Sequence, residues 1–220
     1  VSLGTRKIRL TGGEPLVRKG IIEICRRLSG IEGVRELCIT TNGLLLEKYA
    51  NMLADAGVSR VNISLDTLNS EKYKTITRCH VCDDPVEQIF RGMEACEKAG
   101  LRANKINTVL MGGINDDEIP DLVGLTIDRD IQVRFIELMP IGEARNWDKK
   151  VFISNREVLA RVPELKPAGE SGVSLLYQVP GYRGKVGLIS TVSNHFCSRC
   201  NRLRLTSDGK LKACLHSGKE

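Results

Sequence analysis

The chain has 220 residues, of which 41% are hydrophobic and 27% charged, so it can bury a sizeable core as one domain with an appendage. Its formal net charge of +6 is modest and spread along the chain, which suits an anionic small molecule as well as a nucleic acid. Only 4% of the residues are aromatic, which argues against a protein that stacks single-stranded bases, and no apolar run approaches the roughly 18 residues of a membrane-spanning helix.

Short β-rich runs alternate with segments of helical periodicity along the first two thirds of the chain. Strands are predicted near residues 6–11, 35–40, 60–65, 103–110 and 131–138, with helices near 20–29, 44–56, 85–99 and 117–129. Asn115 precedes Glu118 by three residues and is placed to cap the fourth helix. The alternation indicates βαβ units in a parallel sheet, either doubly wound or barrel-like.

Polar clusters follow four of the predicted strands, at residues 11–15, 40–43, 64–66 and 137–140. Taken alone, each cluster is explained as well by turn formation as by a binding site, because Gly, Asn and Thr commonly end strands. Together they favour a binding site, since ligands of parallel α/β folds bind at the carboxyl ends of the strands. In the first cluster, Gly12 and Gly13 allow a ligand to approach the backbone, but neither a P-loop nor a GxGxxG motif is present.

After Pro140 the pattern changes, and we place a domain boundary between residues 142 and 143. A capping-box sequence at 154–157 predicts a short helix, and a loop rich in proline and glycine follows it. From about Leu175 onward the sequence predicts β-hairpins. We therefore expect residues 1–142 to form the main α/β unit and residues 143–220 to form an appendage.

The eight cysteines fall into two kinds. Cys25, Cys38 and Cys96 stand singly within apolar patterns, which is typical of buried small hydrophobes. The others have close spacings that indicate metal ligation in a reducing compartment: Cys79, Cys82, Cys197, Cys200 and Cys214. We therefore expect a cytoplasmic protein, or a mitochondrial one if the source is eukaryotic, and a disulfide framework is disfavoured.

The C-terminal trio Cys197, Cys200 and Cys214 has the spacing of a three-thiolate site. Spacing alone leaves two alternatives open: structural zinc with His216 as the fourth ligand, or an iron–sulfur cluster. Arg202 and Arg204 stand beside the trio, and alternation along a strand would direct both guanidinium groups to one face. Such a pair suits a phosphate, whereas the simpler reading is a solvated basic strand.

Four further cations lie within predicted strands, namely Lys7, Arg9, Lys105 and Arg134. Strands of a parallel sheet are normally apolar on both faces, so buried charges there need partners. A bound polyanion would supply them. The alternative is that each cation pairs with a carboxylate such as Glu137.

Several segments resemble the radical S-adenosylmethionine GTP 3′,8-cyclases, which begin molybdenum cofactor biosynthesis. They are residues 7–16, 40–43, 62–66, 113–118, 134–140 and 195–214. The likeness runs over nearly the whole chain, and the Cys-x2-Cys-Asn-Arg-Leu-Arg-Leu stretch is its most specific part. The resemblance implies an α/β fold, an incomplete (β/α)6 barrel that lacks its first βα unit, with a C-terminal β-hairpin appendage that binds a cluster.

The resemblance also implies the ligands of this chain and the residues that hold them. Three residues match contacts to S-adenosylmethionine: Gly13, Ser64 and Met139. Five match contacts to GTP, with Lys7 and Arg134 as additions: Arg9, Thr40, Lys105, Arg202 and Arg204. Cys197, Cys200 and Cys214 match ligands of a 4Fe–4S cluster whose open iron meets the guanine base, which makes His216 a neighbour and not a ligand.

The implied reaction is a lyase reaction that converts GTP to (8S)-3′,8-cyclo-7,8-dihydroguanosine 5′-triphosphate. An adenosyl radical would remove the ribose C3′ hydrogen, and the carbon radical would attack C8 of guanine before reduction. The implied partners are GTP, S-adenosylmethionine and an electron donor, and a homodimer is allowed. Neither a nucleic acid nor a membrane is implied.

Three departures from the family pattern qualify this expectation. The Cys-x3-Cys-x2-Cys motif of the radical-generating 4Fe–4S cluster does not occur, and the chain begins with Val1, so we expect that cluster outside this chain and an internal, inactive fragment. Cys79-His80-Val81-Cys82 replaces an Arg-Gly-Gly-like turn, where we favour a variant loop over a metal site. Gly112 stands where the family usually has arginine.

Two other functions compete with the cyclase interpretation. One is a zinc-bearing module that holds nucleic acid on its basic strands. The other is a radical S-adenosylmethionine enzyme with an auxiliary cluster and a different substrate.

Overall fold

One sheet of eight strands organises the part of the chain that the computed structural model describes, residues 1, 4–194 and 196–215. The strand order is β1-β2-β3-β4-β5-β8-β7-β6, parallel from β1 through β8 and antiparallel from β8 to β6. The first five strands are β1 (Lys7–Leu10), β2 (Glu36–Thr41), β3 (Arg60–Ser64), β4 (Arg102–Leu110) and β5 (Gln132–Glu137). The others are β6 (Lys166–Ser171), β7 (Ser174–Gln178) and β8 (Lys185–Ile189). The fold is therefore mixed α/β with a predominantly parallel sheet.

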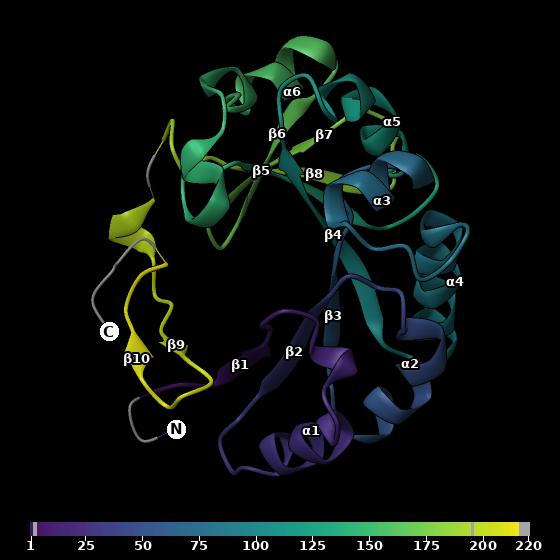
Figure 1. Ribbon diagram of the computed structural model, residues 1–220, viewed down its shortest axis with the longest axis vertical. Coiled ribbons are helices and arrows are strands. Elements are labelled where there is room, and N and C mark those ends of the chain that lie inside the picture. The colour runs from purple at the N-terminus through teal and green to yellow at the C-terminus, as the bar shows by residue number, and fades with distance from the viewer. Residues whose placement is uncertain (2–3, 195, 216–220) are drawn as a thin grey trace.

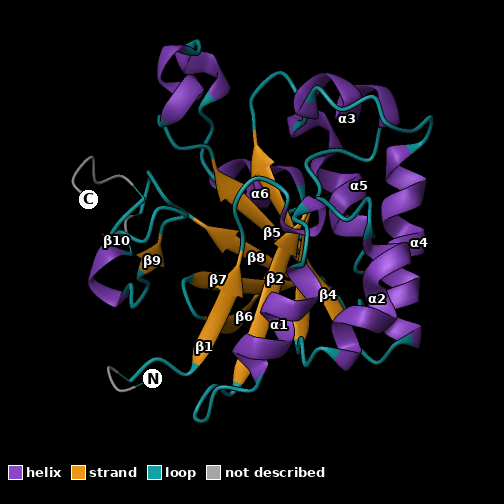
Figure 2. Cartoon of the chain, turned by 60° about the horizontal axis from the view of Figure 1, so that its bottom comes forward, coloured by secondary structure: helices purple, strands orange, loops and turns teal. Residues whose placement is uncertain are grey.

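Six α-helices lie along the outer side of this sheet, where the strands follow an arc (Figure 1). They are α1 (Ile21–Ser29), α2 (Leu46–Asp55), α3 (Ser70–Thr77), α4 (Pro85–Lys98), α5 (Ile119–Gly124) and α6 (Arg156–Arg161). A two-stranded hairpin of β9 (Arg204–Leu205) and β10 (Leu211–Lys212) lies apart from the large sheet, on its open side (Figure 2). Among the described residues no helix is long and apolar enough to cross a membrane.

Helix α4 illustrates how the sequence specifies these elements. The Asp84 side chain accepts a hydrogen bond from the backbone N–H of Glu87 at 3.0 Å, and Pro85 occupies the first turn, where its missing N–H costs nothing. Ile89 and Cys96, seven residues apart on one face of the helix, are completely buried. The helix therefore begins at its cap and is held by the core on one face.

The two faces of the parallel strands have different chemistry because side chains alternate along a strand. One face packs apolar residues against the helices, and six of these residues are at most 1% exposed: Leu37, Ile39, Ile63, Ile106, Val133 and Phe135. The other face carries the residues between them, among which are Thr40, Asn62 and Lys105. These three stand side by side on β2, β3 and β4 in the strand register.

The structure confirms the five predicted strands and the first three predicted helices to within a few residues, and it corrects two details. Helix α3 was not predicted, because Tyr73 is its only buried residue and the helix has almost no apolar periodicity. The fourth predicted helix is shorter, a 3₁₀ turn at Asp116–Glu118 followed by α5. Asn115 does not cap it, since its side chain bonds the backbone of Met111, Asp66 and Val109 instead.

The strands after the predicted boundary at 142/143 join the main sheet, where β8 pairs in parallel with β5. The region predicted as hairpins from about Leu175 contains the antiparallel pair β7–β8, whereas β6 forms where a loop was predicted, and all three strands extend this sheet. Local sequence could not reveal this, because a hairpin has the same pattern whether its outer strand is free or paired with a distant one.

Candidate functional site

The carboxyl ends of β1 and β2 are tied together by the Glu14 carboxylate. It accepts hydrogen bonds from the N–H of Leu16 at 2.9 Å, the hydroxyl of Thr41 at 2.7 Å and the N–H of Asn42 at 2.7 Å. Gly12, just before it, has a φ of +149°, which only glycine adopts readily. Glu14 thus fixes the shape of the glycine loop through its side chain.

The three residues that match S-adenosylmethionine contacts lie at this same carboxyl edge of the sheet. Gly13 follows β1, and a Cβ added to it would have no atom within 4 Å, so space is open beside its backbone. Ser64 is the last residue of β3 and is exposed. Met139 lies two residues after the end of β5 and is half-buried. The loop is therefore open enough for a ligand to approach its backbone.

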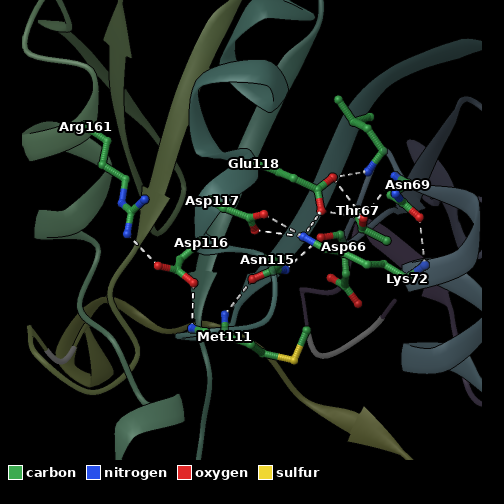
Figure 3. A network of polar contacts seen from close by, with 12 residues as sticks. Asp66, Thr67, Asn69, Lys72, Met111, Asn115, Asp116, Asp117, Glu118 and Arg161 are labelled. Atoms are coloured by element: carbon green, nitrogen blue, oxygen red, sulfur yellow. Dashed lines mark hydrogen bonds and ion pairs between the residues drawn. The ribbon is translucent and has the colours of Figure 1, made fainter.

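A network of polar contacts secures the loops that follow β3 and β4 (Figure 3). Glu118 accepts hydrogen bonds from the Thr67 hydroxyl at 2.7 Å and the Leu68 N–H at 2.6 Å, and it pairs with Lys72 at 2.9 Å. The Asn115 amide donates to the carbonyls of Asp66 at 2.7 Å and Val109 at 2.9 Å. The segment after β4 thereby positions the backbone just beyond Ser64. This part of the site was missed by sequence reasoning, although the side chains were all visible as polar residues near strand ends.

Asp66 belongs to this edge and has an altered acidity. Burial raises the pKa of its carboxyl to about 6, although a hydrogen bond that the Val109 N–H donates to it at 2.7 Å acts in the opposite direction. Asp66 therefore changes its charge within a mildly acidic range of pH.

A group of cations, which we call the inner cationic cluster, consists of Arg9, Arg60, Lys105 and Arg134 on the face of the sheet opposite the helices and of Arg202 in the loop before β9. Burial, and then the charges of Arg9, Arg60 and Arg202, together lower the pKa of Arg134 to about 10. Burial and then the charges of Arg134, Arg60, Lys7 and Arg9 likewise lower the pKa of Lys105 to about 8. Five strands and loops far apart in the sequence thus bring like charges together.

The carboxylates near this cluster neutralise it only in part, because among the described residues Glu36 pairs with one of its members, Arg60. Glu36 pairs with Lys7 at 2.7 Å and with Arg60, while Arg9, Lys105 and Arg134 make no ion pair within the described part of the chain. The suggested pairing with Glu137 is wrong. That carboxylate accepts hydrogen bonds from the N–H groups of Asn155, Val192 and Ser193 at 2.8–3.1 Å, and these bonds lower its pKa in spite of the opposing effect of burial.

Polar atoms without partners lie on the same face as the cluster. The hydroxyl of Thr40 and both amide atoms of Asn62 are buried and make no hydrogen bond in the structure. Buried polar atoms are nearly always paired, so such groups are typical of a site that a ligand or water completes. Thr40 and Lys105 were predicted, whereas Arg60 and Asn62 were not, although Arg60 is also a charged residue within a parallel strand.

The C-terminal residues are only partly brought together. Cys197, Cys200 and Cys214 are free and exposed, and Arg204 is half-buried on β9. No three His, Cys, Asp or Glu side chains of the described residues gather as metal ligands, so the three thiols do not form a ligand set in this conformation. His216, the alternative zinc ligand, lies outside the described residues. Arg202 is close enough to Arg9 and Arg134 to lower the pKa of both.

Gly112 explains one departure from the expected pattern. A Cβ at this position would lie 2.5 Å from the Lys150 carbonyl oxygen and 2.7 Å from the Ile153 side chain. The backbone of 149–153 therefore occupies the space that a side chain at position 112 would need. An arginine here would require a different path for that segment.

Comparisons with known proteins extend these observations to the whole chain. Residues 1–126 match the model of the radical SAM superfamily, and residues 131–220 match the molybdenum cofactor synthesis C-terminal family. The chain is 52% identical to a GTP 3′,8-cyclase of Alkaliphilus oremlandii and 53% identical to one of Peptoclostridium acidaminophilum, in each case over 100% of this chain and 68% of the relative. The solved structure "Native anSMEcpe with bound AdoMet and Cp18Cys peptide" is 17% identical with a TM-score of 0.46, over 69% of this chain and 43% of that one, a likeness from which no conclusion follows.

Proposed function

We propose that this chain, which belongs to the GTP 3′,8-cyclase family of the radical SAM superfamily, binds GTP and S-adenosylmethionine and takes part in the cyclisation of GTP. The product is (8S)-3′,8-cyclo-7,8-dihydroguanosine 5′-triphosphate, the first intermediate of molybdenum cofactor biosynthesis. The match of residues 131–220 to the molybdenum cofactor synthesis family supports this assignment.

The inner cationic cluster is the observation that carries the proposal. Arg134 and Arg9 lower the pKa of Lys105, Arg9 lowers that of Arg134, and none of the three has an ion-pair partner in the described chain. Desolvated like charges are unstable unless an anion meets them. A triphosphate carries enough negative charge to do so, and two of the three side chains are arginines, which bind phosphate oxygens through parallel N–H groups.

The remaining contacts follow from where each residue lies. The phosphates would bind to the cluster, with Arg202 and Arg204 closing over them from the hairpin. The Thr40 hydroxyl, which lacks a partner, would donate a hydrogen bond to the same ligand. Gly13, Ser64 and Met139 would hold S-adenosylmethionine at the carboxyl edge, the first through its backbone and the second through its hydroxyl. The nucleotide would thus bind on the inner face of the sheet, and adenosylmethionine would bind next to it, at the carboxyl ends of the strands.

The cofactors belong to the proposal as well. Cys197, Cys200 and Cys214 are free, exposed thiols, which is the chemistry that a 4Fe–4S cluster needs, although the described conformation does not gather them. When bound, S-adenosylmethionine and the radical-generating 4Fe–4S cluster supply the radical for the reaction. The chain's own contribution is to bind both substrates, to orient them and to balance their charge.

We infer that the arc of parallel strands is an incomplete (β/α)6 barrel, that residues 143–220 carry the cluster and GTP contacts, and that β9 and β10 form the cluster-binding hairpin. An electron donor and a homodimer complete the proposal. The parallel order β1-β2-β3-β4-β5 and the outer layer of helices support the barrel.

GTP binding to the whole protein, purified anaerobically with its clusters, tests the nucleotide assignment. We expect GTP to bind more tightly than ATP, and the affinity to weaken as salt is added, because the contacts are ionic. Arg202→Ala and Arg204→Ala should each weaken GTP binding by about tenfold to a hundredfold, as expected for the loss of a charge-assisted hydrogen bond. The control is Arg26→Ala. Arg26 is exposed on α1, which lies on the opposite side of the sheet from the cluster, and it pairs there with Glu23 of the same helix.

Two outcomes would contradict the proposal. Equal affinity for GTP and ATP in the wild type and in both variants would favour an enzyme with another substrate. A colourless protein that binds zinc stoichiometrically after anaerobic purification, and holds no iron or sulfide, would favour the zinc-bearing module. Neither outcome is expected from a member of the GTP 3′,8-cyclase family.

A further inference from the structure

The loop between α3 and α4 contains two cysteines whose side chains face the same way. Helix α3 ends at Arg78, which adopts the left-handed conformation with a φ of 55°, and the chain bends again at residues 81–83 before α4 begins. Cys79 and Cys82 are half-buried and pack against the hydrophobic core, whereas His80 and Val81 between them are exposed. The thiols of Cys79 and Cys82 therefore both lie on the side of this four-residue loop that contacts the core.

These two thiols differ from the other cysteines of the sheet and helices. Cys25, Cys38 and Cys96 are completely buried, and burial raises the pKa of Cys25 to about 11 and that of Cys96 to about 12. Buried thiols of this kind are inert, while reactive thiols are partly accessible to solvent. Cys79 and Cys82 have that partial access, although burial and then the neighbouring Cys79 raise the pKa of the Cys82 thiol.

A metal is not the best occupant of this loop. His80 points to solvent, and the described residues contain no group of three His, Cys, Asp or Glu side chains that could hold a metal ion. Two thiols alone leave a tetrahedral zinc site two ligands short. The Cys-x2-Cys spacing next to a βα unit is instead typical of dithiols that exchange with disulfides.

Tyr73 provides a second observation, which is that a buried polar group and not only apolar side chains lies near the two thiols. Its ring is 2% exposed, and its buried hydroxyl makes no hydrogen bond in the structure. Burial raises the pKa of this hydroxyl, and the neighbouring thiols Cys79 and Cys82 raise it further, followed by Glu14 and Asp66. The unpartnered hydroxyl is therefore near enough to the thiol pair, and to the carboxylates at the carboxyl edge of the sheet, for their charges to act on it.

We propose that Cys79 and Cys82 form a redox-active dithiol that exchanges with low-molecular-weight disulfides. One cysteine thiolate attacks a sulfur of the small disulfide, and one small thiol leaves with the proton. The second cysteine then displaces the other small thiol and closes the Cys79–Cys82 disulfide. The two cysteines lose two electrons and two protons in total, and the small disulfide is reduced to two thiols.

Mass spectrometry of the whole protein tests the inference, because trypsin releases both cysteines in one peptide. Cleavage after Arg78 and Arg91 gives residues 79–91, which contain no other cysteine, and the next peptide, 92–98, contains only the buried Cys96. The protein is equilibrated anaerobically with a series of oxidised and reduced glutathione mixtures, and free thiols are then alkylated. We expect the internal disulfide in peptide 79–91, lighter by two hydrogen atoms, to exceed any oxidised form of peptide 92–98 by at least about tenfold.

Single variants identify the two steps. Cys82→Ser should leave Cys79 as a glutathione adduct that is not resolved, and Cys79→Ser should do the same at Cys82. The wild-type result does not depend on either variant folding well. The inference is overturned if peptide 79–91 remains a dithiol across the series, carries only glutathione adducts, or forms disulfides with Cys197, Cys200 or Cys214. None of these outcomes would alter the expected GTP affinity, so the two proposals fail separately.

Discussion

The two faces of the same parallel sheet have opposite physical states. The outer face consists of apolar side chains such as Ile39 and Phe135, which are completely buried against the helices. The inner face gathers Arg9, Lys105 and Arg134 without ion pairs in the described chain, and it leaves the Thr40 hydroxyl without a partner. The comparison teaches that one face stabilises the fold, while the other gathers positive charge, which is the state expected of a surface that binds an anion.

The largest effect should come from breaking the outer face. Phe135→Ala removes a completely buried ring at the centre of β5 and leaves a cavity, so the free energy of unfolding should fall by about 3–5 kcal/mol. Chemical denaturation of the whole protein measures this. Val17→Ala, at a side chain that is 71% exposed, is the control and should change stability by less than about 0.5 kcal/mol. An equal loss in both variants would contradict the assignment of the core to this face.

The next effect concerns Asp66, at the edge where the two faces meet. Its pKa is about 6 in the folded protein and 3.8 for an ordinary aspartate, so between these values the folded state holds a proton that the unfolded state has lost. Stability should therefore fall as the pH rises through this range, by on the order of 3 kcal/mol in total.

Asp66→Asn isolates this contribution, because asparagine cannot ionise. Denaturation curves at several pH values should show the wild type losing stability relative to the variant as the pH rises from about 4 to about 6. A difference between the two proteins that does not change with pH would show that the Asp66 carboxyl keeps its ordinary pKa.

Removing a charge from the inner face should separate binding from stability. Arg134→Met relieves repulsion with Arg9, Arg60 and Arg202, so the free energy of unfolding should stay the same or rise. GTP affinity should fall by about tenfold to a hundredfold, because an ionic hydrogen bond is lost. Calorimetry and denaturation measure the two quantities. A large loss of stability with unchanged affinity would assign Arg134 to the core.

The smallest effect is a pH dependence of binding that Lys105 should impose. Its pKa is about 8 before ligand binds, lowered by burial and then by Arg134, Arg60, Lys7 and Arg9. As the pH rises above this value the ammonium group loses its charge, and GTP affinity should fall by up to about tenfold per pH unit. Lys105→Arg should keep its charge and bind GTP with little change from about pH 7 to about pH 9. The same decline in both proteins would exclude Lys105 as its cause.

Much of the fold was predictable from local pattern, and the exceptions have physical causes. Helix α4 has both a cap and an apolar stripe, so its bounds were predicted closely. Helix α3 lacks the stripe, and only the Asn69 cap, which accepts from the N–H groups of Glu71 and Lys72, indicated where it begins. The pairing of β8 with β5 depends on contact between segments about fifty residues apart, which no local pattern encodes.

The candidate site shows the same division. Lys105 and Arg134 were recognisable because charges inside parallel strands are unusual. Arg60 could have been found by that rule and was overlooked. Glu137 could not be assigned from sequence, since its partners Asn155 and Ser193 come from later loops that only the folded chain brings to it. The trio Cys197, Cys200 and Cys214 stays a prediction, because spacing suggests ligation that the described conformation does not form.

The sequence by itself determined the alternation of strands and helices, the identity of the charged strand residues and the family, because these depend on residue order and periodicity. Only the tertiary structure decided which charges meet. Arg9, Arg60, Lys105 and Arg134 lie on four strands and Arg202 lies in the loop before β9, and they interact because the parallel register and the curvature of the sheet bring them to one side. Electrostatic energy depends on distance in space, which residue order alone does not specify.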